Sequence, residues 1–121
     1  MRINDFRAFI QNRYSYLMYN NEFPAITNKN IGLVRIFPTP TTNKEINRLN
    51  AQILIKSDSM QKAEAKAWEI YEDLRIQTHF LIGDTMIIYC STNQPEFIQS
   101  VDSGAFLYSV NLQLITDQQG G

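Results

Sequence analysis

The chain has 121 residues with 44% hydrophobic and 12% aromatic content, one cysteine and a formal net charge of −1 at pH 7. These features favour one soluble domain over residues 1–121, and they argue against a membrane helix of ~20 apolar residues, a signal peptide, an internal disulfide and general affinity for DNA. Charge is unevenly divided along the sequence: residues 1–60 hold eight Lys or Arg and four Asp or Glu, whereas residues 61–121 hold three Lys or Arg and eight Asp or Glu. If this division is also spatial, the two sides of the molecule are complementary, which suits head-to-tail association.

The first element is expected to be a helix. Apolar side chains at spacings of three and four predict an amphipathic helix over residues 3–19. Asn4 or Asp5 can cap its start, and Pro24 lies beyond its expected end.

Two strands are predicted next, over residues 33–37 and 49–56. They most simply form an antiparallel pair joined by a long polar arm, residues 38–48. Leu54 is the one apolar residue on the otherwise polar side of the second strand. Arg35 is expected to face water or a partner.

The strongest helix is predicted over residues 59–77, with Asp58 and Gln61 spaced as a capping box. Trp68 lies at the border of its apolar stripe, where it is either an edge-of-core residue or a contact for another chain. The expected buried side chains of this helix are Met60, Ala63, Ala67, Ile70, Tyr71 and Leu74.

A hairpin is predicted where Gly83-Asp84 joins strands over residues 79–82 and 85–91. Cys90 in the second strand is expected to be a buried free thiol, which favours a reducing compartment. Residues 92–104 are expected to be a connection.

A long alternating strand is predicted to close the fold, ending near Thr116, with residues 117–121 a flexible tail. Its apolar face is expected to pack beneath the helices, and its neutral polar face to meet water or a neighbouring subunit. The apolar set is Tyr108, Val110, Leu112 and Leu114; the polar set is Ser109, Asn111 and Gln113. The elements together predict an α+β two-layer sandwich, with two main helices on one face of a mainly antiparallel sheet, in the order α-β-β-α-β-β-β.

No residue pattern points to catalysis. His79 is the single histidine and lacks a nucleophile motif around it, so no Ser/His/Asp or Cys/His arrangement is expected. Neither a zinc ligand set nor a phosphate-binding glycine loop occurs. We therefore expect no enzyme activity, metal or cofactor.

Four segments carry a resemblance to a known family: Ile3-Asn4-Asp5-Phe6, the strand pair from Leu33 to Ser57, the alanine-rich stretch from Lys62 to Leu74, and the ending Asp102-Ser103-Gly104 through Asn111. In these segments and in element order the chain resembles the tail terminator (tail completion or minor capsid) proteins of long-tailed phages with non-contractile tails. The resemblance covers nearly the whole chain. The tyrosine-rich first helix has no counterpart in it.

The resemblance implies a structural virion protein at the head–tail junction, assembled in the host cytoplasm. Such a protein forms a ring, commonly a hexamer, that ends tail-tube polymerisation and contacts the tube protein and the head connector, while genomic DNA passes through the lumen. From the charges, we expect basic groups on one subunit to face acidic groups on the next. The basic set is Arg35, Lys44 and Arg48; the acidic set is Glu69, Glu72 and Asp73.

Two other functions stay open from the sequence. One is a head–tail connector or head completion component, which would bind the portal side. The other is a ferredoxin-like ligand-binding or enzymatic domain, which would need a pocket converging on His79 and the acidic helix face.

Overall fold

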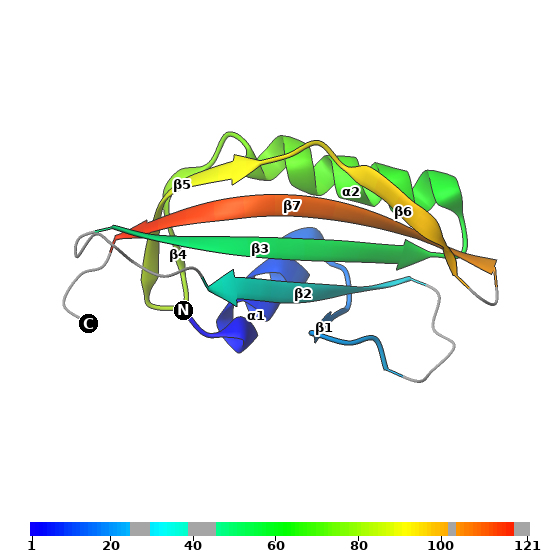
Figure 1. The fold of residues 1–121 in the computed structure, drawn as a ribbon, viewed down its shortest axis with the longest axis horizontal. Coiled ribbons are helices and arrows are strands. Elements are labelled where there is room, and N and C mark those ends of the chain that lie inside the picture. The colour runs from blue at the N-terminus through cyan, green and yellow to red at the C-terminus, as the bar shows by residue number, and fades with distance from the viewer. Residues whose placement is uncertain (25–29, 39–45, 102–103, 118–121) are drawn as a thin grey trace.

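The computed structural model describes residues 1–24, 30–38, 46–101 and 104–117. Figure 1 shows how the elements are arranged. They follow one another as α1 (Ile3–Tyr14), β1 (Met18–Asn20), β2 (Ile31–Pro38), β3 (Ile46–Ser57), α2 (Met60–Leu74), β4 (Thr78–Ile82), β5 (Thr85–Thr92), β6 (Glu96–Val101) and β7 (Ala105–Asp117).

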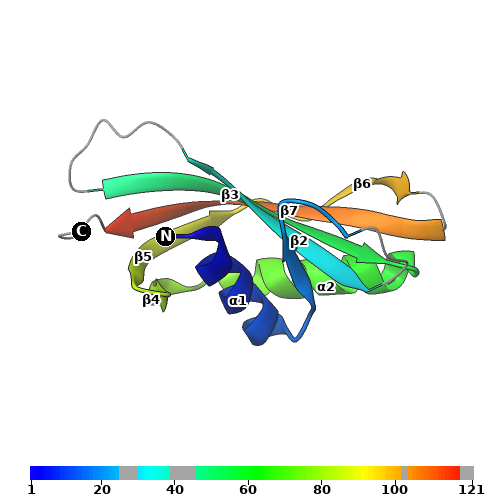
Figure 2. The ribbon, with the colours of Figure 1, turned by 90° about the horizontal axis from the view of Figure 1, so that it is seen from below.

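The strands form one sheet in the spatial order β1-β2-β3-β7-β5-β4. The long strand β7 pairs with β3 along one side, and with β6 and then β5 along the other. The β1–β2 pair is parallel, and the other pairs are antiparallel. Both helices lie on one face of the sheet (Figure 2), so the predicted two-layer α+β sandwich is confirmed.

The main hydrophobic core fills the space between the helices and the sheet. Alanines on α2 are buried against the sheet, as the sequence predicts, and the even-numbered face of β7 packs beneath the helix. The buried core residues contributed by these two elements are Ala63, Ala67, Ile70, Leu74, Tyr108, Val110, Leu112 and Leu114.

The first helix is shorter than predicted. It ends at Tyr14 because Ser15 adopts a left-handed conformation with φ of 52°, which stops the helical hydrogen bonding. Met18 is buried but belongs to β1, and Leu17 is 45% exposed. The helix also starts earlier than the predicted caps: Arg2 is the N-cap residue, and it makes no side-chain cap.

The cap and end of the second helix also differ from the prediction. Ser59, not Asp58, is the N-cap residue, and its Oγ accepts a 3.3 Å hydrogen bond from the backbone N–H of Lys62. The helix ends at Leu74 rather than residue 77. Met60 begins the helix and is 45% exposed, so it lies outside the buried stripe.

Two strands were not predicted, β1 and β6. The segment 92–104 was expected to be a connection, but its residues 96–101 pair with β7, with a shift of register between Phe97 and Gln99. That irregularity disrupts the period-two pattern by which a strand is read from sequence. The predicted β4–β5 hairpin is confirmed, with Gly83 at a φ of 59°.

The ends of two predicted segments also change. β3 already begins at Ile46, so residues 46–48 of the predicted polar arm are strand, and residues 39–45 lie outside the described part. Asp117, the first residue of the predicted tail, is the last residue of β7. The other tail residues, 118–121, lie outside the described part of the chain.

Candidate assembly surfaces

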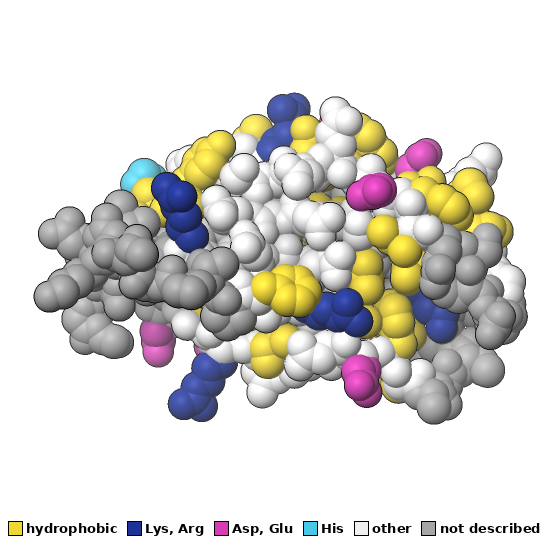
Figure 3. All heavy atoms as spheres, viewed as in Figure 1, with side chains coloured by type: hydrophobic (Ala, Val, Ile, Leu, Met, Phe, Trp, Pro, Cys, Tyr) yellow, Lys and Arg dark blue, Asp and Glu magenta, His cyan; other side chains and the backbone are white. Residues whose placement is uncertain are grey.

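The sheet face opposite the helices, here called the open face, carries a ladder of amide side chains. Asn50 and Gln52 of β3 lie across from Gln113 and Asn111 of β7. Gln113 Nε2 donates to Asn50 Oδ1 at 3.2 Å, and Gln52 Nε2 donates to Asn111 Oδ1 at 3.1 Å. Figure 3 shows this face: neutral polar atoms dominate its centre, and hydrophobic atoms gather toward one end.

Beside this ladder the open face is hollowed into a shallow pocket of about 350 Å³. Phe37 of β2 and Ser91 of β5 line it together with three of the amides. Asn111 and Gln113 therefore lie on the predicted polar face, half-buried and bonded within the subunit. Their side chains give the open face neutral hydrogen-bonding groups.

Ser109 is on the same predicted face but is fully buried. It lies across from Leu54 of β3, and its Oγ has no hydrogen-bond partner among the described residues. A side chain with no exposed surface cannot take part directly in a contact between subunits. This part of the strand therefore belongs to the interior of the subunit.

Two of the three predicted basic residues lie on strands. Arg35 of β2 donates through Nε to the backbone oxygen of Asn21 at 3.3 Å. Arg48 is exposed on β3, in register with Ile115 of β7. Lys44 lies outside the described residues.

One of the predicted acidic residues, Asp73, is engaged inside the subunit. Arg13 binds its carboxylate through two nitrogens, at 2.5 and 3.2 Å, and the Tyr14 hydroxyl donates to it at 2.7 Å. These hydrogen bonds, that from Arg13 foremost, lower the pKa of Asp73. Burial, and then the carboxylate, raise the pKa of Tyr14. Asp73 is thus an internal link between the two helices.

The other predicted residues of α2 are more accessible. Glu69 accepts a 3.0 Å ion-pair hydrogen bond from Lys66, and Glu72 is exposed. Trp68 is half-buried, with its ring edge-on to Tyr71 at a centroid distance of 5.3 Å. Since α2 covers one face of the sheet and Arg35 lies toward the other, these acids and Arg35 are not brought together within one subunit.

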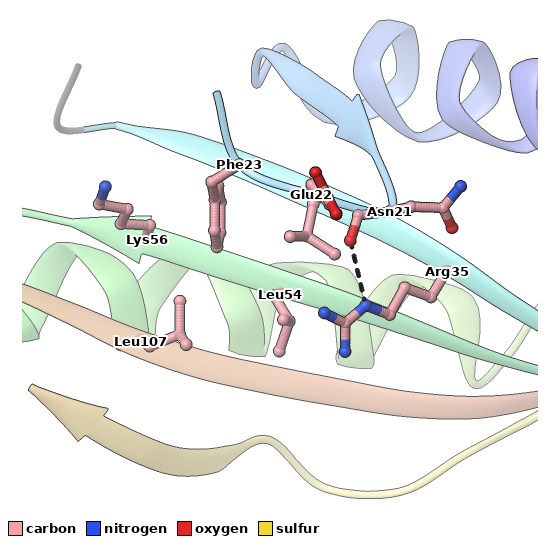
Figure 4. A pocket seen from close by; sticks show the side chains of 8 residues that line it. Asn21, Glu22, Phe23, Arg35, Leu54, Lys56 and Leu107 are labelled. Carbon is pink, nitrogen blue, oxygen red and sulfur yellow. Dashed lines mark hydrogen bonds between the residues drawn. The ribbon is translucent and has the colours of Figure 1, made fainter. Parts of the chain in front are cut away.

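A second apolar cluster, which the sequence reasoning missed, lies on the open face. Leu33, Leu54 and Leu107 come from three adjacent strands, and Phe23 packs against them. They line a pocket of about 360 Å³ with Arg35 and Lys56, shown in Figure 4. The one available clue was Leu54, which breaks the alternation of its strand because it faces this cluster.

The described residues show no arrangement typical of an active site. His79 is exposed in β4 with a φ of 54°, and no cluster of three or more His, Cys, Asp or Glu in this part of the chain could hold a metal ion. Cys90 is buried as predicted, and burial raises its pKa to about 12, so the thiol stays protonated at neutral pH. No helix among the described residues is long and apolar enough to cross a membrane.

The chain is similar in sequence to one protein family and in fold to several solved structures. The sequence model of the bacteriophage tail terminator protein family matches residues 9–118. No curated protein sequence matches the chain.

Solved structures share the fold at low sequence identity. One is a protein whose name describes no function; it is 13% identical, covers 98% of this chain and 91% of its own, and has a TM-score of 0.61. Another is part of the "Virion of native gene transfer agent (GTA) particle"; it is 9% identical, covers 94% and 90%, and has a TM-score of 0.65.

Proposed function

Because this chain belongs to the bacteriophage tail terminator family and is a structural tail protein of the virion, we propose that it forms a ring capping the tail tube. The ring, of six copies, stops tube polymerisation and provides the joint to the head connector in a long-tailed phage with a non-contractile tail. The observation that carries this proposal is the family match over residues 9–118. The protein acts at the head–tail junction after assembly in the host cytoplasm.

A ring requires two different surfaces on each subunit. A heterologous contact repeated with a closing rotation joins one side of each copy to the other side of the next. The basic set, Arg35, Arg48 and Lys44, is proposed to face exposed carboxylates on the α2 side of the adjacent subunit, Glu69 and Glu72 among them. Asp73 is not part of this set because Arg13 and Tyr14 already engage it. Trp68 adds apolar area on that side.

The amide ladder on the open face is proposed to line the lumen. Asn50, Gln52, Asn111 and Gln113 present neutral hydrogen-bonding groups. Neutral amides form no strong ion pairs with phosphates, so DNA can pass the ring without being held. No sequence-specific DNA recognition and no catalytic step belong to this role.

Electron microscopy of particles assembled without this protein tests the proposal. We expect tails that are longer than normal and not joined to heads, because nothing stops the tube protein from adding. Restoring the gene in trans should return both tail length and joining.

The same experiment separates the terminator from a head–tail connector or completion component. Tails of normal length together with heads that leak DNA would contradict the terminator role and favour that alternative. None of these pockets among the described residues is lined by His79, so none of them favours a ligand-binding or enzymatic role.

A further inference from the structure

The second pocket on the open face, which we call the leucine pocket, has an apolar floor. Leu33 of β2, Leu54 of β3 and Leu107 of β7 form this floor, and the Phe23 ring stands beside it. The pocket has a volume of about 360 Å³, which is room for a large apolar side chain. Neither α1 nor α2 covers it, because both lie on the other face of the sheet (Figure 2).

The rim of the leucine pocket carries two cations that have no acidic partner among the described residues. Arg35 and Lys56 lie at opposite ends of it in Figure 4. Neither makes a salt bridge with a described residue: Arg35 donates through Nε to a backbone oxygen, and Lys56 Nζ lies 5.3 Å from the centre of the Phe23 ring. Glu22 also lines the pocket but pairs with neither. The pocket therefore suits an apolar side chain accompanied by a carboxylate.

That combination occurs on β6, which pairs with β7 beside Leu107. Glu96, Phe97 and Ile98 are consecutive and exposed, and the two apolar side chains are each 42% exposed. Among the described strands, β6 pairs only with β7, so its outer side has no neighbour. We call Glu96–Ile98 the acidic edge.

The acidic edge is held in place by packing onto the helix layer. The Phe97 ring contacts the Tyr108 ring edge-on at 5.5 Å, and the Tyr108 hydroxyl donates to Glu64 of α2 at 3.3 Å. Ile98 is 42% exposed, and Glu96 makes no salt bridge with a described residue. The register shift between Phe97 and Gln99 also discourages another strand from pairing regularly along this edge.

We propose that the acidic edge of one copy docks in the leucine pocket of the next copy, with Ile98 entering the pocket and Glu96 meeting Lys56. This inference rests on the proposed ring and names the surfaces that form it. The pocket residues and Glu96–Ile98 are different sets, so the contact joins two unlike surfaces and is heterologous, as ring closure requires. The apolar insertion supplies affinity, and the charges set the register.

Disulfide trapping between copies tests the contact. Ile98→Cys and Lys56→Cys are made as separate variants, mixed, and oxidised under conditions where native mass spectrometry shows assembly. We expect a mixed disulfide dimer only in the mixture, because a heterologous contact brings position 98 of one copy to position 56 of another. Cys90 is buried and does not compete. Lys62→Cys, on the exposed side of α2, replaces Lys56→Cys in the control mixture and should not cross-link.

The outcomes separate this inference from the proposed function. A ring that assembles without the mixed disulfide would contradict the proposed docking surfaces but not the proposed ring. Cross-linking of Lys56→Cys to the tube protein instead would also overturn the inference, by giving the pocket a different occupant. Failure of the wild-type protein to form rings, alone or on tubes, would contradict the ring itself.

Charge reversal gives a second and independent test. Lys56→Glu should raise the protein concentration needed for assembly by about tenfold, which corresponds to ~1.4 kcal/mol. Adding Glu96→Lys to the same chain should restore most of the loss, because every contact then again joins opposite charges. Circular dichroism confirms that each variant is folded, and Lys62→Glu is the matched control. A double variant no better than Lys56→Glu alone would contradict the pairing.

Discussion

The Tyr14 hydroxyl donates a 2.7 Å hydrogen bond to the carboxylate of Asp73, 59 residues further along the chain. This contact joins the last residue of α1 to the last turn of α2, and Arg13 reinforces it. Tyr14→Phe keeps the buried ring but removes the donor. We expect it to lower the free energy of unfolding by about 1 kcal/mol, measured by urea denaturation. Tyr71→Phe is the control, since the Tyr71 hydroxyl has no hydrogen bond to the described residues; equal losses in both variants would contradict this role.

The lowered pKa of Asp73 predicts a dependence of stability on pH. A carboxyl whose pKa is lower in the folded state stabilises the protein above its unfolded pKa of about 3.9, and the contribution is lost as pH falls through the folded value. The stability difference between wild type and Asp73→Asn should therefore be constant from about pH 6 to 8 and shrink below about pH 4. Urea denaturation of both proteins across this range measures it. A difference that grows toward acid pH would have the wrong sign.

Gly32 marks a place where two strands approach too closely for a side chain. A Cβ at this position would lie 2.5 Å from Met18 Sδ and 2.8 Å from the backbone oxygen of Leu54. The Met18 side chain can adjust, but the β3 backbone is fixed by its pairing. Gly32→Ala should destabilise the protein by about 1–3 kcal/mol. Gly104 is exposed and has a φ of 78°, and a Cβ there would meet none of the described atoms within 4 Å. Gly104→Ala therefore reports on backbone strain alone, whereas Gly32→Ala reports on steric crowding.

Ser109 offers the opposite expectation. Its Oγ is buried without a partner among the described residues, so removing it abolishes an unsatisfied polar group at the cost of one small cavity. Ser109→Ala should be neutral or stabilising by up to about 1 kcal/mol, and it should assemble as the wild type does. Thermal unfolding and native mass spectrometry check the two parts. A loss of assembly with unchanged stability would show that this side chain has a role in contacts after all.

The sequence predicts the main layers because their patterns are local. The alternation around Val110 and Leu112, and the helical spacing of Ala63, Ala67 and Ile70, directly encode faces that pack together. Residue order alone could not predict that Ser15 would take a left-handed conformation, which ends α1 and frees Met18 to pair with β2. A local side-chain contact stabilises this turn, because Gln11 Oε1 accepts a 3.0 Å hydrogen bond from the Met18 N–H.

The candidate surfaces were less predictable than the fold. Glu72 could be selected as charged and exposed, but the engagement of Asp73 depends on Tyr14 and Arg13, which are distant in sequence. The leucine pocket is built from single residues of three strands that pair only in the folded sheet. A lone mismatch such as Leu54 indicates a second cluster only when the register is known.

Addition of tube protein to preformed tail tubes tests the central claim most directly. Tubes are incubated with this protein, fresh tube protein is added, and tube lengths are measured by electron microscopy. We predict a ring at the tube end and no further growth, while untreated tubes lengthen. Tubes that bind no ring and lengthen as the untreated ones do would contradict the account.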